Sequence, residues 1–322
     1  MALLSTLLAM ALGLTVGIGA SFAQSAYPER AIEMVITFPP GGPTDTAARL
    51  VQPFLAANLK VPVALVNKGG SGGAAGMDFV AKAKPDGYTI AATVRSTVSI
   101  TPVIQANVPY RMKDFEMIGS YAASAQAILV KKGAPWKTLE ELVADAKAHP
   151  GKLTYGSAGQ GTNSYFTMEL LKLARGLDIA HVPFGGSGPM KTAILGGHVQ
   201  IGAISLSTMI PVIRSGDVVA LVISGDKRNP AVPDVPTMAE KGVAEASLST
   251  IMELYAPAKT PKAVVDRLAQ ALAAAMKNPE MVAALDKAGL EPYYNSPDIS
   301  RQQAEQEYEV VLAATKKLGP PK

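Results

Sequence analysis

The sequence predicts an α/β protein built as two lobes, and three observations lead to this expectation. Short runs of β-branched residues alternate with helical patterns of roughly 10–15 residues, which is typical of βαβ units and parallel sheets. The chain has 322 residues, which is more than one hydrophobic core comfortably serves. Glycine-rich turns separate several of the expected strands from the helices that follow them.

The first segment is expected to be removed from the mature protein. Residues 3–18 are apolar and uncharged, and Ser21-Phe22-Ala23 offers the small residues of a cleavage site, so Gln24 would begin the mature chain. This apolar run has the length of a signal-peptide core and is short for a membrane span. No Lys or Arg precedes it, which leaves the position of the start codon open. We expect residues 1–23 to be a signal peptide and the mature protein to be exported and soluble.

The positions of the expected strands and helices are predicted from the residue types along the chain. β-branched and apolar runs predict strands at 33–38, 62–66, 88–93, 127–130, 153–155, 179–182, 199–205 and 218–223. Helices are expected to begin near Asp45, Gly73, Thr138, Thr162 and Gly188. After Pro257 the pattern is helical only, with helices at 261–276, 279–287 and 296–317 and no strand between them.

Composition excludes several classes of function. The chain contains no cysteine, which excludes disulfides, thiol catalysis and thiolate metal sites. Its three histidines lack metal-ligand spacing, so we expect no metal. The loose dinucleotide pattern at 70–75 has no acidic residue at the end of the next strand, and a Walker lysine is missing, so we expect no cofactor. The net charge of +4 gives a mild preference for anionic partners. Basic residues are scattered among acidic ones and aromatic residues are sparse, so we expect no nucleic-acid partner.

The segment Phe38–Arg49 is the most informative part of the chain. It follows a predicted buried strand and opens a helix. Gly41 and Gly42 let the backbone turn sharply, and Thr44 or Asp45 can cap the helix. A turn of this kind directs free backbone N–H groups and a helix dipole to one place, which suits an anion.

Three later turns share this chemistry, at 69–76, 156–163 and 185–188. In a doubly wound sheet such turns meet at the carboxyl ends of the strands, where ligands bind. For any single turn, glycine that merely closes a tight bend is the simpler explanation. Four turns with Ser, Thr and Asn interleaved favour one shared anion site.

One motif points to a different function. Gly69–Gly73 matches the G-x-S-x-G pattern of serine hydrolases, with Ser71 as the nucleophile. The base would have to be His149 at a helix end, His181 in a strand or His198 at a turn, and each has an ordinary structural explanation. An exported serine hydrolase using Ser71 is therefore the alternative function.

The chain resembles the solute receptors of tripartite tricarboxylate transporters, the Bug receptor family. The matching segments follow the family's order and span the mature chain: 38–49, 67–76, 84–89, 155–162, 181–186, 196–199, 233–237, 240–242 and 256–261. The resemblance implies a type II-like, two-lobed periplasmic-binding-protein fold, each lobe a doubly wound sheet with flanking helices. It implies lobe 1 at 27–123 plus 251–322 and lobe 2 at 124–250.

The resemblance also implies a function in the periplasm without enzymatic turnover. The protein would close on a small organic carboxylate and deliver it to the membrane permease subunits of the transporter. A ligand sensor without a transport role stays open as an alternative, and we expect a monomer. Matched residue by residue, the expected ligand contacts are Phe38, Pro40, Gly41, Gly42, Thr44, Asp45, Arg95, Ser96, Thr97, Ser157, Gly161, Thr162, Asn163 and Ser205.

Four departures from the family pattern bear on the ligand, and one of them is Ile251, which replaces a frequent aromatic residue. Arg95 stands where a small or polar residue is common, and it could pair with a second ligand carboxylate or lie on the surface at the lobe rim. Ile204 replaces a frequent acidic residue, which disfavours an amino-acid ligand. Glu253 could face the cleft or pair with a lysine. Together they favour an aliphatic or aromatic mono- or dicarboxylate over citrate.

Overall fold

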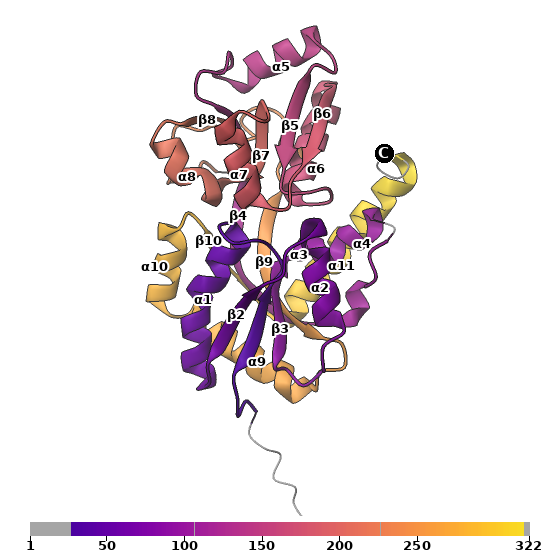
Figure 1. Ribbon diagram of the computed structural model, residues 1–322, viewed down its shortest axis with the longest axis vertical. Helices are drawn as coiled ribbons and strands as arrows, with labels where there is room; N and C mark the ends of the chain where they lie inside the picture. Colours follow the sequence, from indigo (N-terminus) through magenta and orange to yellow (C-terminus); the bar gives the residue numbers. More distant parts are fainter. Residues whose placement is uncertain (1–26, 106, 226, 319–322) are drawn as a thin grey trace, which may run out of the picture.

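A computed structural model describes residues 27–105, 107–225 and 227–318. The expected signal peptide at 1–23 lies outside these residues. The described elements form two lobes, which lie one above the other in Figure 1. The lower lobe contains both ends of the described chain, and the upper lobe is formed by its middle. The residue boundaries given above for the two lobes stay a prediction.

The lower lobe is built around a parallel sheet in which β1 pairs with β2 and with β3. Its first elements are β1 (Ile32–Ile36), α1 (Pro43–Leu59), β2 (Val63–Asn67), a 3-10 turn (Ser71–Gly73), α2 (Ala74–Ala81), β3 (Thr89–Val94), α3 (Arg95–Ser99), α4 (Thr101–Ile104) and a second 3-10 turn (Met112–Asp114). The chain returns to this lobe with α9 (Lys262–Met276), α10 (Pro279–Lys287), β10 (Glu291–Asn295) and α11 (Pro297–Leu318). Its core joins both ends of the chain, because Ile32 and Met34 pack in one cluster with Leu268, Leu272 and Leu285.

The upper lobe is built around β5, which pairs in parallel with β6 and β7. Its elements are α5 (Leu139–Ala148), β5 (Leu153–Ser157), α6 (Asn163–Arg175), β6 (Ile179–Pro183), α7 (Ser187–Gly196), β7 (Ile201–Ser205), α8 (Leu206–Arg214), β8 (Val218–Ile223) and a 3-10 turn (Ala244–Ala246). These alternating strands and helices are the βαβ units that the sequence predicts.

Two strands connect the lobes. The strand β4 (Phe115–Lys131) pairs antiparallel with β9 and β10 in its first part and with β7 and β8 in its last part. The strand β9 (Ser249–Pro257) lies between β3 and β4. The main path of the sheet therefore runs β2-β1-β3-β9-β4-β7-β5-β6, and the lobes are joined by hydrogen-bonded strands.

The expected strands and helices are confirmed to within a few residues at most positions. The expectation of no strand after Pro257 is wrong, since β10 pairs with β4. The expected strand 127–130 is only the end of β4, and β9 was not expected at all. The first part of β4 is rich in Gly, Ala and Ser, which have weak strand propensity, so its pairing with β9 supplies the order there.

Candidate functional site

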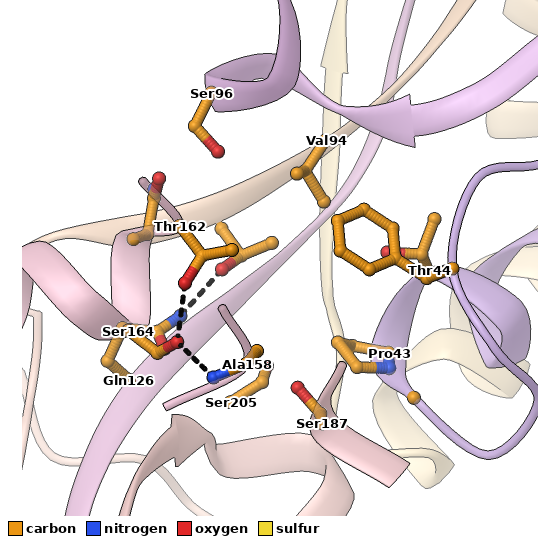
Figure 2. A pocket seen from close by; sticks show the side chains of 14 residues that line it. Pro43, Thr44, Val94, Ser96, Gln126, Ala158, Thr162, Ser164, Ser187 and Ser205 are labelled. Atoms are coloured by element: carbon orange, nitrogen blue, oxygen red, sulfur yellow. Dashed lines mark hydrogen bonds between the residues drawn. The ribbon is translucent and has the colours of Figure 1, made fainter. Parts of the chain in front are cut away.

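A small cavity of about 30 Å³ lies where the two lobes meet. Most of its lining residues are buried. Figure 2 shows side chains from both lobes arranged around this space. The lining residues are Phe38, Gly42, Pro43, Thr44, Val94, Ser96, Gln126, Ala158, Thr162, Asn163, Ser164, Ser187, Ser205 and Thr250.

Four helices begin at this cavity. The helix α1 starts at Pro43, α6 starts at Asn163, α7 starts at Ser187, and α8 follows Ser205 directly. Each of these residues belongs to the lining. Because the amino end of a helix carries a partial positive charge, four positive helix ends surround one space.

Several hydrogen-bond donors at the cavity are not used by the protein. Within the described ranges, the backbone N–H groups of Thr44, Asn163 and Ser187 have no acceptor. The hydroxyl groups of Thr44, Ser96 and Ser187 also form no hydrogen bond with any other described residue. No charged side chain occurs in the lining. The cavity therefore offers neutral donors and helix dipoles, a combination that suits an anion.

Two other hydroxyl groups at the cavity hold the loop after β5. Thr162 Oγ1 donates to the carbonyl oxygen of Gly159 at 2.7 Å and accepts from the N–H of Tyr165, which makes it the N-cap of α6. Ser164 Oγ lies 2.9 Å from Thr162 Oγ1 and accepts from the N–H of Ala158 (Figure 2). These hydroxyls fix the shape of the site.

This difference between the hydroxyls gives a testable prediction. Replacing Thr162 by valine removes the N-cap of α6, so the free energy of unfolding should fall by about 1 kcal/mol. Replacing Ser96 by alanine removes a hydroxyl without such partners, and the change should stay within about 0.5 kcal/mol. Urea denaturation of both variants measures the two values. Equal stability of the variants would contradict the capping role of Thr162.

Half of the residues predicted from the sequence line the cavity, namely Phe38, Gly42, Thr44, Ser96, Thr162, Asn163 and Ser205. The others lie outside the lining, namely Pro40, Gly41, Asp45, Arg95, Thr97, Ser157 and Gly161. Seven lining residues were not expected as ligand contacts: Pro43, Val94, Gln126, Ala158, Ser164, Ser187 and Thr250. Of these, Pro43, Ala158 and Ser187 lie within glycine-rich turns, so the turn signal alone could have found them.

Asp45 holds the first turn together. Its carboxylate accepts hydrogen bonds from the N–H of Gly41, from Arg49 Nε and from Asn67 Nδ2. Burial by itself would raise the pKa of this carboxyl, but these bonds outweigh it and hold the pKa of Asp45 below its usual value. The negative charge of Asp45 is therefore stabilised by residues of the lower lobe, to which Asp45 itself belongs.

Arg95 is part of a buried ion pair. Its Nε and Nη2 lie 3.0 and 2.7 Å from Glu253 Oε1, and the two residues are 8% and 1% exposed. The alternative of a surface arginine is therefore wrong, and so is a lysine partner for Glu253. The other oxygen of Glu253 accepts from Tyr255 Oη. Arg95 thus ties α3 to the crossing strand β9.

A third carboxyl group lies near this pair. Ser99 Oγ, on α3, donates to Glu307 Oε2 on α11 at 2.6 Å. Burial raises the pKa of the Glu307 carboxyl above its usual value, while the bond from Ser99 and the charge of Arg95 oppose the shift. The C-terminal helix is thereby linked to the same short helix that carries Ser96.

Ser157, the last residue of β5, forms hydrogen bonds that hold the loop that follows this strand. Its Oγ lies 2.8 Å from His181 Nε2 and accepts from the N–H of Gly159. The His181 ring stacks on Tyr155 at 4.8 Å between centroids. Burial lowers the pKa of His181, although the charge of Glu169 opposes the shift. Ser157 is fully buried, and His181 is half-buried beside it in the upper lobe.

Ser71 belongs to a second space between the lobes, of about 400 Å³. No histidine or acidic residue occurs in its lining, and in the part of the chain that the structure describes no histidine bonds to Ser71. Across this space Gln105 of the lower lobe donates to the carbonyl oxygen of Gln160 of the upper lobe at 3.0 Å. The geometry required for a Ser71 hydrolase is not formed here.

Two absences concern only the described residues. No group of three or more His, Asp or Glu side chains there is placed to hold a metal ion. Within residues 27–105, 107–225 and 227–318, no helix is both long and apolar enough to cross a membrane.

Two α/β lobes that are joined by crossing strands and enclose a polar cavity define a periplasmic-type solute-binding protein. The chain belongs to the tripartite tricarboxylate transporter family of receptors, because the model of that family matches residues 47–318. The family is one of solute-binding receptors, and the fold expected from the sequence is confirmed.

Known proteins similar to this chain agree with this family. BugT of Bordetella pertussis is 32% identical over 289 residues, which cover 89% of each chain. The solved structure of the periplasmic binding protein BugD has a TM-score of 0.86 and 31% identity, covering 92% of this chain and 100% of that one. MatC from Rhodopseudomonas palustris, solved with bound malate, has a TM-score of 0.84 and 30% identity, covering 89% of this chain and 99% of that one.

Proposed function

We propose that the protein is an exported periplasmic receptor that captures a small organic carboxylate between its lobes and delivers it to the permease of a tripartite tricarboxylate transporter. One observation carries the proposal. Four helix amino ends meet at a cavity with unused N–H and hydroxyl donors and without any charged side chain in its lining. A carboxylate is the ligand that such a site accepts without a counter-ion.

The helix ends and hydrogen bonds of the cavity can supply enough free energy to bind a carboxylate at micromolar affinity. Each helix end stabilises a nearby anion by about 0.3–1 kcal/mol. Each hydrogen bond to a charged group contributes about 1.5–3 kcal/mol. Four helix ends and three such bonds therefore reach the roughly 8 kcal/mol that micromolar affinity requires.

The ligand contacts follow from the same donors. Thr44 and Ser96 would hold the ligand from the lower lobe, and Asn163 and Ser187 from the upper lobe. Phe38 would form an apolar wall, since its ring lines the cavity and is almost fully buried. Binding would then pull the two lobes together, because each lobe supplies only part of the contacts. The malate bound to the related MatC supports a carboxylate as the ligand class.

A thermal-shift screen of the mature protein tests this proposal. The panel contains mono-, di- and tricarboxylates, each matched with its amide, and inorganic phosphate. A carboxylate at 100 times its dissociation constant should add about 2.7 kcal/mol of stability, which is a shift of several degrees. The matched amides should give no shift. A protein that responds to no carboxylate, even after unfolding and refolding to remove a bound ligand, would contradict the proposal.

A further inference from the structure

The cavity also contains hydrogen-bond acceptors that nothing in the protein satisfies. Asn163 Oδ1 and Gln126 Oε1 are buried and have no hydrogen-bond partner among the described residues. Both side chains line the cavity, and they are 5% and 1% exposed. Buried polar atoms are nearly always paired in folded proteins, so two unpaired acceptors at one cavity need an explanation.

The orientation of the Asn163 amide is fixed by its surroundings. Its Nδ2 donates to the carbonyl oxygen of Ser249 on β9. A carbonyl oxygen can only accept, so the NH2 group must face Ser249 and Oδ1 is left on the other side. Gln126, which Figure 2 shows among the residues around the cavity, donates from Nε2 to Thr250 Oγ1 at 2.6 Å. A hydroxyl can both donate and accept, so the partner fixes the amide orientation for Asn163 but not for Gln126. In this arrangement the amide oxygens are the parts of both side chains that remain for a ligand.

A ligand that only accepts hydrogen bonds cannot satisfy these oxygens. A buried acceptor without a hydrogen-bond partner lowers the stability of the complex. A carboxylate oxygen placed beside it adds electrostatic repulsion between two oxygen atoms that both only accept. A ligand group with its own O–H or N–H removes this cost. A ligand that carries a hydrogen-bond donor in addition to its carboxylate satisfies the two oxygens directly, whereas an acceptor-only ligand would need a bridging water.

The charges around the cavity distinguish between the possible donors. An ammonium group would require a nearby carboxylate, but no acidic residue lines the cavity. Asp45, which follows directly after Thr44, is already bound by Arg49 and Asn67. The four helix amino ends also disfavour a second positive charge. A neutral hydroxyl group fits this environment.

We infer that the ligand is a hydroxycarboxylate, whose hydroxyl group donates to Asn163 Oδ1 or Gln126 Oε1 while its carboxylate is held by the helix amino ends. This inference rests on the proposed function and narrows it to one class of ligand. It assigns Asn163 and Gln126 as residues that set specificity.

Matched ligand pairs test the inference by isothermal titration calorimetry. The hydroxylated members are malate, lactate and 3-hydroxybutyrate, and their partners without the hydroxyl group are succinate, propionate and butyrate. At least one hydroxylated ligand should bind ten times or more tighter than its partner. In Asn163→Ala and Gln126→Met this ratio should fall, in at least one variant to less than threefold. Any loss of the bonds to Ser249 or Thr250 affects both members of a pair and cancels in the ratio.

Ser187→Ala is the matched control, because it removes a donor from the same cavity and should weaken both members of a pair alike. A ratio near one for every pair in the wild-type protein overturns the inference, although carboxylate binding itself would stand. Tighter binding of aspartate than of malate also overturns it. A ratio unchanged in both amide variants overturns the assignment of Asn163 and Gln126. If none of the six acids binds and the wider carboxylate panel also fails, the proposed function fails as well.

Discussion

Replacing Gly188 by alanine is expected to weaken carboxylate binding at least tenfold while both lobes stay folded. Gly188 lies in the first turn of α7, and a Cβ added there would stand 2.7 Å from the carbonyl oxygen of Pro40 on the opposite lobe. This oxygen belongs to the backbone and cannot rotate away. The three nearest atoms that the new methyl group would meet belong to Pro40 and Gly41, so this clash disappears when the lobes separate. Alanine also favours a helix over glycine.

The measurement combines titration calorimetry with small-angle X-ray scattering. The variant should keep or exceed the wild-type melting temperature, and its radius of gyration should fall less when the ligand is added. Gly185→Ala is the control, because a Cβ at Gly185 has no atom within 4 Å. Wild-type affinity in Gly188→Ala would show that closure does not require the approach of α7 to Pro40.

Replacing Arg95 by alanine is expected to lower the free energy of unfolding by about 3–5 kcal/mol. The substitution leaves the carboxylate of Glu253 buried without its positive partner, and Glu253 is only 1% exposed. The nearby Glu307 would then lose a favourable charge as well. Because the guanidinium group faces Glu253, mono- and dicarboxylates should lose affinity to the same extent.

Urea denaturation measures this loss against Arg30→Ala. Arg30 also pairs with an acidic residue, Asp86, but the two side chains are 62% and 40% exposed. An exposed pair of this kind contributes about 0–1 kcal/mol. A loss below about 1 kcal/mol in Arg95→Ala would contradict the structural role of the buried pair. A loss of affinity for dicarboxylates but not for monocarboxylates would instead indicate that Arg95 binds a second carboxylate of the ligand.

Local signals in the sequence were enough to predict the turns that surround the site. Gly41 and Gly42 lie directly before Pro43, the first residue of α1, and Thr162 immediately precedes α6, whose N-cap it is. Their glycine and capping residues impose a conformation on a few neighbours, whatever the rest of the fold does. The alternating strands and helices of both lobes were predictable for a similar reason.

Contacts between distant parts of the chain were not predictable in this way. Arg95 and Glu253 are 158 residues apart, so neither partner indicates the other in a single sequence. Gln126 lies inside a long strand without any motif around it, and it reaches the cavity only because β4 crosses between the lobes. The strand β9 could not be predicted for the same reason, since the strands that it pairs with, β3 and β4, come from much earlier in the chain.

The lower lobe takes its core from both ends of the chain, and this arrangement sets an order of assembly during synthesis. Ile32 and Met34 leave the ribosome early, whereas Leu268, Leu272 and Leu285 emerge only near the end. The upper lobe is contiguous, so its core can close first. The amino-terminal third must meanwhile wait for the part of its core that the C-terminal helices supply. A nascent chain that has passed its midpoint thus still lacks part of the core of its lower lobe.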